Sequence, residues 1–422
     1  MSAASAVQTN RSALWDQFCM VRQASMKLAS RLSAEDQMVQ SMADASPTKW
    51  HLAHTTWFFE TFILLPHAAG YRAFDPRFTF LFNSYYKSLE EGHPVRATRG
   101  TFSRPSLADV HAYRSRVDEA LEKLVASEAG ETVADLLELG LHHEQQHQEL
   151  ILTDIKHALW TNPLRPAYCE ATATPETALA PMRWIVFDGG LYEIGHGGSG
   201  FAFDNEGPRH SVFLRPFQLA ARPVTNAEFL QFIEEGGYRR PELWLSEGWD
   251  TVCAAGWKAP FYWEPGDGEW HVFTTAGMQP VREDEPVCHI SFFEADAYAR
   301  WAGARLPLEA EWEVAASGVE VAGNFAGSER FHPAPPTAKG DWQQLYGDVW
   351  EWTASPYLAY PGFRAPQGAL GEYNQKFMCN QLVLRGGSCA TPQSHIRDTY
   401  RNFFPPAARW QFMGLRLAND RN

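Results

Sequence analysis

The feature that most constrains this 422-residue chain is a run of histidines inside a long helical pattern, which extends from about Glu131 to His157. His143 and His147 are four residues apart, so on a helix their side chains lie one above the other on the same face. This spacing allows two imidazoles to bind one metal ion. The sequence His143-Glu144-x-x-His147 also matches the zinc-protease pattern, in which Glu144 would act as the general base. The alternative interpretation needs no metal: the histidines could lie on a solvent-exposed helix face that is rich in glutamine and glutamate.

The first half of the chain predicts a bundle of four helices. Ser46 and Pro47 are typical of an N-cap followed by proline in the first helical turn. Ser106 with Asp109 three residues later predicts another helix start. One long crossover joins the second and third helices, and in such bundles metal sites are built from inward side chains. The expected helices span about residues 12–32, 47–62, 106–126 and 131–157.

The composition changes after the fourth helix. Residues 166–182 are rich in Ala, Thr, Pro and Glu without periodicity and are interpreted as a linker. Residues 10–165 are then the helical domain and residues 183–422 a second domain. Short apolar runs and frequent glycines predict that this second domain has a modest sheet, much irregular structure and only two short helices, near residues 225–226 and 293–302.

Charge and cysteine content narrow the class of protein. The net charge of −14 and the lack of a long basic run argue against nucleic-acid and anionic-membrane partners. The six cysteines are scattered without a CxxC pair, which is typical of a reduced, cytoplasmic protein. Neither a signal sequence nor an 18-residue apolar run is recognisable. Small-molecule chemistry in the cytoplasm is therefore expected, with the oligomeric state left open.

A third metal ligand is expected from the second helix. His54 lies in an aromatic stretch between Trp50 and Trp57, and His51, three residues earlier, is the rival ligand. A histidine in such surroundings is usually a packed core residue, but a facing helix with His143 and His147 favours a ligand. Three neutral imidazoles leave up to three positions of an octahedral ion open. This ligand set suits iron, zinc, copper or nickel and does not select among them.

The crossover loop carries two further groups of candidate residues. Tyr85 and Tyr86 either cap the bundle or place a phenol near the metal, where it could give a proton or a hydrogen atom to dioxygen. Arg96, Arg99 and Arg104 either form a solvated basic loop or bind a substrate carboxylate through paired hydrogen bonds.

Taken together, the motifs resemble those of one known family, the sulfoxide synthases of ergothioneine biosynthesis. In that family a DinB-like four-helix bundle is fused to a domain like the formylglycine-generating enzyme, which is related to C-type lectin folds. The resemblance covers about residues 12–420. The matching segments are residues 50–55, 143–147, 222–226, 304–313, 347–352 and 384–388.

The resemblance implies a metal, a reaction and a set of site residues. Iron(II), Fe(2+), would be held by His54, His143 and His147. The reaction would join a thiol sulfur to the imidazole C2 of hercynine, N-α-trimethylhistidine, and oxidise it to a sulfoxide with dioxygen. Gln146 matches a family residue that forms hydrogen bonds in the substrate pocket.

A segment near the C-terminus matches the part of the family that binds the trimethylhistidine head group. Asn402 would bond the carboxylate region, and Phe403 and Phe404 offer ring faces to a quaternary ammonium. In the branch that uses γ-glutamylcysteine, an acid stands where this chain has Phe404. A charge-assisted contact of about 1.5–3 kcal/mol would be missing. The resemblance therefore favours the branch that uses cysteine, with γ-glutamylcysteine and a selenium donor as alternatives.

Other functions explain fewer of these residues. A zinc protease leaves His54 and the second half unexplained. A zinc-dependent thiol transferase would not need the second domain or its segment around Asn402. A metal-binding sensor module remains an alternative, because lectin-like domains also serve as binding modules. A formylglycine-generating oxidase would need copper on a cysteine pair, and Cys379 and Cys389 do not have that family's spacing.

Overall fold

The computed structural model describes residues 3–89, 92–172, 181–336 and 340–421, and these form two compact units. The first unit comprises Met1–Leu164 together with Gln367–Tyr373, and the second comprises Arg165–Pro366 with Asn374–Asn422. The short segment Gln367–Tyr373 thus groups with the helices, although the sequence-based boundary places it in the second domain. Residues 173–180 of the expected linker lie outside the described residues.

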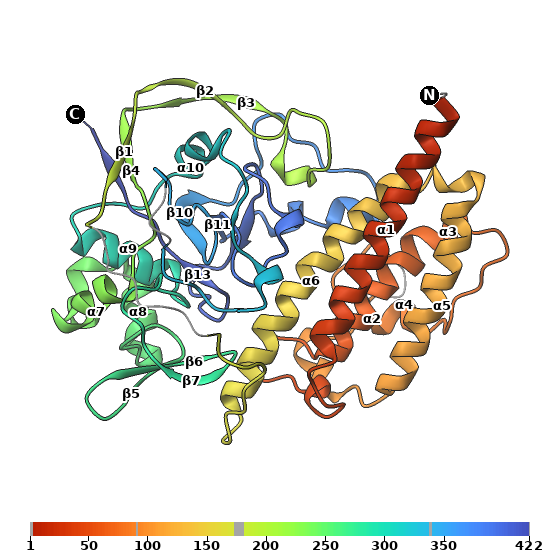
Figure 1. The fold of residues 1–422 in the computed structure, drawn as a ribbon, viewed down its shortest axis with the longest axis horizontal. Coiled ribbons are helices and arrows are strands. Elements are labelled where there is room, and N and C mark those ends of the chain that lie inside the picture. Colours follow the sequence, from red (N-terminus) through yellow and green to blue (C-terminus); the bar gives the residue numbers. More distant parts are fainter. Residues whose placement is uncertain (1–2, 90–91, 173–180, 337–339, 422) are drawn as a thin grey trace. The chain divides into compact units, whose positions relative to one another are not determined.

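Long helical segments dominate the described residues of the first unit (Figure 1). Helix α6 packs against α1 and α2, and α5 packs against α2 and α1. The segment that begins with α2 continues through a π-helical turn, Glu60–Leu64, into α3. These elements are α1 (Ala3–Ala29), α2 (Thr48–Phe59), α3 (Leu65–His67), α4 (Phe78–Leu81), α5 (Leu107–Ala126) and α6 (Ala134–Thr161). The predicted four-helix architecture is confirmed, with α1 beginning earlier and α6 extending further than expected.

The two predicted helix starts have different outcomes. Ser106 and Asp109 form the expected capping box, in which the Ser106 hydroxyl accepts from the Asp109 N–H at 3.2 Å. Ser46 was predicted as the N-cap of α2, and this is wrong because Pro47 occupies that position. The Ser46 hydroxyl accepts from Arg99 instead, at 2.9 Å. The predicted cap of α5 thus forms from residues close in sequence. At α2, the Ser46 side chain bonds a residue distant in sequence instead of capping the helix.

A buried carboxylate joins all four helices. Glu144 on α6 accepts hydrogen bonds from Arg22 on α1 at 2.9 Å and from Arg114 on α5 at 2.8 Å. Arg22 also donates to Thr56 on α2 at 3.1 Å, and Ser25 donates to Glu144 at 2.6 Å. Since a buried charge is tolerated only when it is paired and hydrogen-bonded, this network fixes the relative register of the helices.

The second unit contains several small sheets (Figure 1). One has the strand order β1-β4-β14, all antiparallel, and another has the order β12-β11-β10-β13, in which β10 and β13 are parallel. The first three-stranded sheet is formed by β1 (Trp184–Phe187), β4 (Phe217–Ala220) and β14 (Ala418–Asp420). The four-stranded sheet is formed by β10 (Trp350–Pro356), β11 (Leu382–Arg385), β12 (Asn402–Phe404) and β13 (Met413–Gly414). The others are the hairpin of β2 (Gly190–Ile194) and β3 (His210–Leu214), the meander of β5 (Trp263–Pro265), β6 (Trp270–Thr274) and β7 (Gly277–Pro280), and the pair of β8 (Gly323–Asn324) and β9 (Tyr346–Gly347).

The described part of the second unit has more helix than expected. The predicted helices are present as α7 (Asn226–Glu234) and α9 (Phe292–Trp301). The expectation of two helices only is wrong, because α8 (Ser246–Ala255) and α10 (Glu309–Ala316) also form. Each spans no more than three turns, which is too short for apolar periodicity to distinguish a helix from a loop.

Buried arginine–glutamate pairs hold this irregular unit together. Arg416 bonds both oxygens of Glu351 on β10, and the Trp312 indole N–H donates to the same carboxylate at 2.8 Å. Arg385 at the end of β11 donates to Glu313 on α10 at 2.6 Å. The second-half motifs that carry the family resemblance therefore have a structural role in this unit.

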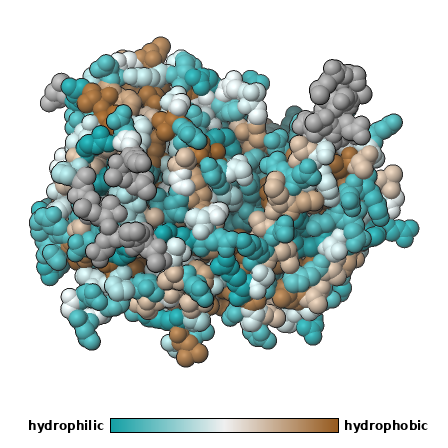
Figure 2. All heavy atoms as spheres, in the orientation of Figure 1, coloured by the Kyte–Doolittle hydropathy of each residue, from teal (hydrophilic) through white to brown (hydrophobic). Residues whose placement is uncertain are grey.

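Hydrophilic side chains are spread over the face shown in Figure 2, with apolar side chains in small groups between them. In the part of the chain that the structure describes, none of the helices has the length and apolar character required to cross a membrane.

Candidate metal centre

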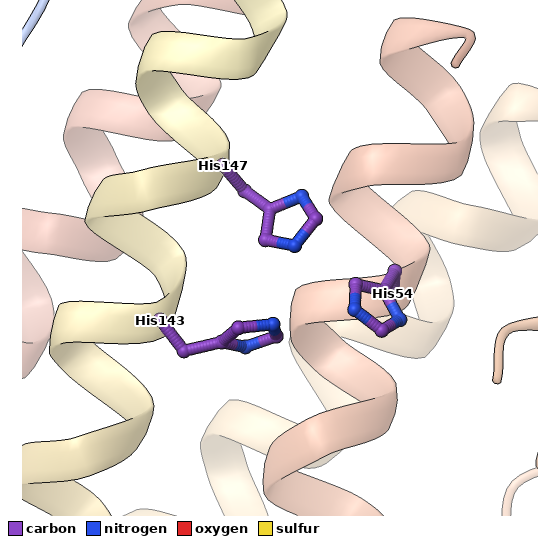
Figure 3. Close-up of side chains that lie close together, drawn as sticks. All are labelled: His54, His143 and His147. Carbon is purple, nitrogen blue, oxygen red and sulfur yellow. The ribbon is translucent and has the colours of Figure 1, made fainter. Parts of the chain in front are cut away.

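Three histidines from two facing helices point toward a common space (Figure 3). His143 and His147 come from α6, and His54 comes from α2. One nitrogen of each ring lies within 4.8 Å of the others, and the ring centroids are 4.6–5.0 Å apart. Each residue is at most 9% exposed. The structure thus brings together the three histidines that the sequence indicated as metal ligands.

The protonation of these rings suits a metal ion. Burial lowers the pKa of His143 to about 3, and burial together with the neighbouring histidines holds the pKa of His54 and of His147 well below the usual value. The Nδ1 atom of His54 lies 2.6 Å from the Phe82 carbonyl oxygen, to which it donates, so Nε2 carries the lone pair. The buried Nε2 of His54 and Nδ1 of His143 have no hydrogen-bond partner. Neutral rings with unsatisfied buried nitrogens fit a bound divalent cation.

Aromatic rings enclose His54 on both faces. Its imidazole stacks on Trp50 at 4.6 Å with an interplanar angle of 12°, and on Trp57 at 5.4 Å and 15°. The side chain of Arg99 is also buried, and its guanidinium lies 3.5 Å from the Trp50 ring centroid. The ring of His54 is therefore held in one orientation, as expected for a residue that must present a single nitrogen to a metal.

Glu144 does not take part in this group. Its carboxylate is saturated by Arg22, Arg114 and Ser25, and it is fully buried within the bundle. Burial by itself would raise the pKa of Glu144, but the two guanidinium groups outweigh this effect and lower it to about 2. A general base needs a free lone pair directed at the metal-bound water, so the zinc-protease interpretation has no base.

Gln146 contacts Tyr373, a residue outside the predicted motifs. The Tyr373 hydroxyl donates to Oε1 of Gln146, and the Tyr373 ring centroid lies 5.8 Å from that of His143. Glu372, the preceding residue, accepts from the backbone N–H groups of Lys87 and Ser88 at 3.0 and 2.8 Å. These contacts are all within the first unit and link the segment Gln367–Tyr373 to α6 and to the crossover loop.

Tyr85 and Tyr86 lie in the same neighbourhood. Tyr86 is fully buried, stacks on Tyr85 at 4.7 Å and lies 5.6 Å from the Trp57 ring. Burial, with Tyr85 and Tyr373 nearby, raises the pKa of Tyr86 well above its usual value. This phenol therefore keeps its proton at neutral pH.

The three arginines of the loop differ in their surroundings. Arg99 is buried, and burial together with Arg96 lowers its pKa to about 9. Arg96 is half exposed and donates to the Asp44 carbonyl. Arg104 is exposed and donates to its neighbour Ser103 at 3.3 Å.

The segment Asn402–Phe404 is strand β12 in the second unit. Phe403 stacks on Tyr357 at 4.0 Å with an angle of 10°, and Phe377 lies 5.8 Å from it. Phe404 meets Trp410 edge-on, and the Asn402 side chain accepts from the Phe403 N–H. The segment thus contributes to an aromatic cluster in that unit.

Comparison with known proteins agrees with this architecture. Residues 17–151 match the DinB superfamily, and residues 170–346 and 340–421 match the sulfatase-modifying factor enzyme 1-like domain. The hercynine oxygenase of Mycolicibacterium thermoresistibile is 35% identical over 414 residues, which cover 89% of this chain and 87% of that protein. The chain belongs to the hercynine oxygenase family.

Two further relatives match nearly the whole chain and part of it, respectively. The hercynine oxygenase of Mycolicibacterium smegmatis is 32% identical over 97% of this chain and 99% of its own length. The formylglycine-generating enzyme of Streptomyces coelicolor is 28% identical over 59% of this chain. Members of the family are oxygenases, so this chain is an enzyme, and the predicted helical domain followed by a strand-containing domain is confirmed.

Proposed function

We propose that this enzyme is an iron(II)-dependent sulfoxide synthase that joins the sulfur of cysteine to the imidazole C2 of hercynine with dioxygen. The observation that supports it most directly is the buried group of three neutral histidines in a chain of the hercynine oxygenase family. A bound iron(II) ion would supply a centre at which dioxygen is reduced. His54, His143 and His147 would hold it.

The proposed reaction balances without an external reductant. The C2–H bond of the imidazole and the S–H bond of the thiol are lost, and one C–S bond forms. One oxygen atom of dioxygen enters the sulfoxide, and the other leaves as water with the two hydrogens. The two substrates together supply the four electrons that dioxygen accepts.

Side chains of this chain would bind and orient the two substrates. The buried cation Arg99, beside Trp50, is suited to a thiol donor's carboxylate, and Gln146 with Tyr373 offers hydrogen bonds to an imidazole. Arg96 and Arg104 remain predicted contacts for the same carboxylate. Asn402, Phe403 and Phe404 remain predicted contacts for the hercynine head group, since aromatic ring faces bind a quaternary ammonium.

Cysteine is the proposed donor because Phe404 replaces the acid that would meet the amino group of γ-glutamylcysteine. The decisive experiment is a competition in which iron-loaded enzyme and hercynine are given cysteine, γ-glutamylcysteine or selenocysteine, with products identified by mass. We expect oxygen uptake that requires both hercynine and a thiol, equals the amount of sulfoxide formed and is fastest with cysteine. Uptake that does not depend on hercynine would contradict the proposed reaction, and faster turnover with another donor would contradict only the choice of cysteine.

Replacing a proton-donating tyrosine is expected to divert the enzyme toward oxidation of the thiol alone. Tyr85→Phe and Tyr86→Phe remove one hydroxyl each, and loss of a general acid costs about 10²–10⁴-fold. In the variant that lacks the true donor, sulfoxide formation should fall by about 100-fold while thiol sulfinate accumulates. Tyr71→Phe serves as the comparison, because its hydroxyl donates to Glu60 at 2.7 Å and has no proposed role in the reaction, so sulfoxide formation should be unchanged. Unchanged product ratios in the Tyr85 and Tyr86 variants would refute their role.

A further inference from the structure

His51 is buried on α2, one turn before His54, but its imidazole is not part of the group of three. Its Nδ1 lies 2.8 Å from Nδ1 of His147, and its Nε2 lies 3.0 Å from Oδ2 of Asp154. Asp154, His51 and His147 therefore form a continuous hydrogen-bonded chain that ends on one of the histidines facing the common space. Their exposures are 5%, 2% and 9%, so little water competes for these bonds.

The carboxylate sets the direction of this chain. A carboxylate can only accept, so with Asp154 as the partner Nε2 of His51 carries the proton of their hydrogen bond. A neutral imidazole has a single N–H, and Nδ1 of His51 is then an acceptor. Nδ1 of His147 must donate to it, which leaves the lone pair of His147 on Nε2.

We propose that His51 and Asp154 are positioning residues for the metal centre, which fix the tautomer and the ring orientation of His147 so that its Nε2 faces the ion. The proposal rests on metal binding by the three histidines. Metal-binding histidines commonly donate their second ring nitrogen to a carboxylate or carbonyl, and loss of that partner costs about 10–100-fold in metal affinity. In this protein, the imidazole of His51 lies between the ligand His147 and the carboxylate of Asp154.

The backbone arrangement supports a dedicated role for Asp154. His143, His147 and Asp154 stand at positions i, i+4 and i+11 of α6, which fall on one face of a helix with 3.6 residues per turn. The same Oδ2 atom of Asp154 accepts from the backbone N–H of Ser46 at 2.7 Å, immediately before the N-cap of α2. One carboxylate thus ties the start of α2 to α6 and sets the position of His51.

The test measures metal affinity and the spectrum of the bound metal in the full chain. His51→Phe keeps a planar ring but removes both hydrogen bonds, and we expect Co²⁺ to bind about 10–100-fold more weakly with altered visible absorption bands. His395→Phe is the control, since it removes another buried imidazole, which bonds Tyr400 at 2.9 Å in the second unit, and it should leave both readouts unchanged. Affinity within twofold of the parent in folded His51→Phe protein would overturn the proposal.

A second variant separates positioning from general damage. Asp154→Asn keeps the size of the side chain and an acceptor for Ser46 but removes the charge, so we expect a smaller loss of affinity in the same direction. Because Asp154 acts through His51, the double variant should bind Co²⁺ no more weakly than His51→Phe alone. If the two losses of Co²⁺ affinity add in the double variant, Asp154 does not act through His51, and the proposed hydrogen-bonded chain is contradicted.

The parent protein supplies a readout that does not depend on a variant folding. In Zn²⁺-loaded protein labelled with ¹⁵N-histidine, His147 is expected to show a protonated Nδ1 and a metal-bound Nε2. The reverse tautomer would overturn the proposal. A parent that binds neither ion would instead refute the metal centre on which the proposed function depends.

Discussion

Replacing His54 with alanine is expected to remove metal binding and oxygenase activity together while the helices remain folded. His54 presents a buried Nε2 without a hydrogen-bond partner to His143 and His147, and its Nδ1 is already committed to the Phe82 carbonyl. Loss of this nitrogen leaves two ligands for the ion. The affinity for iron(II) should fall by more than the roughly 100-fold caused by losing an outer partner of a ligand. Activity in the reconstituted variant should fall to background.

Two measurements check this result. Iron content after anaerobic reconstitution reports binding, and the melting temperature reports folding and metal stabilisation in the same samples. A metal at about 100 times its dissociation constant stabilises a folded protein by about 2.7 kcal/mol, which corresponds to roughly 5–10 °C for a unit of this size. We expect this increase in the parent and not in His54→Ala. His395→Phe removes a buried histidine of the second unit that bonds Tyr400, and it should retain iron. Full iron content in His54→Ala would refute the ligand assignment.

The sequence was sufficient to place two of the three histidines because their spacing is local. A helix with residues four apart puts both side chains on one face, whatever the rest of the chain does. Residues close in sequence do not determine whether His51 or His54 is the third ligand. Every residue of α2 is buried, so the helix has no polar face to reveal how it is rotated toward α6. Packing between the two helices decides which imidazole faces the group and which lies behind it.

Contacts between residues far apart in the chain were beyond prediction for a related reason. The capping box of Ser106 is made by a residue three positions away and could be read from the sequence. Ser46 instead bonds Asp154 and Arg99, which lie 108 and 53 residues away, and so it does not cap α2. Tyr373 reaches Gln146 across 227 residues without any motif around it. Only the fold brings such partners together.

Replacing Glu144 with alanine is expected to destabilise the helical unit more than any exposed substitution. The variant removes the carboxylate that pairs with buried Arg114 and leaves Arg22 paired with the carboxylate of Asp118. Breaking a buried ion pair by removing one partner costs about 3–5 kcal/mol, a large share of the stability of a typical domain. Urea unfolding followed by circular dichroism measures this loss. Glu122→Ala, which removes an exposed carboxylate on α5, should change the stability by less than about 0.5 kcal/mol.

The dependence of this loss on pH distinguishes a paired carboxylate from a packing effect. Glu144 has a pKa of about 2 in the folded protein against 4.5 for the unperturbed group, so its ionised form is favoured by folding. Its contribution is complete above pH 4.5 and declines as the pH falls toward 2. Between pH 5 and about pH 3, the difference in unfolding free energy between the parent and Glu144→Ala should therefore shrink. A difference that stays constant over this range would show that Glu144 stabilises the bundle by its volume alone. The charge that the zinc-protease pattern assigns to catalysis would then have no electrostatic role in the fold either.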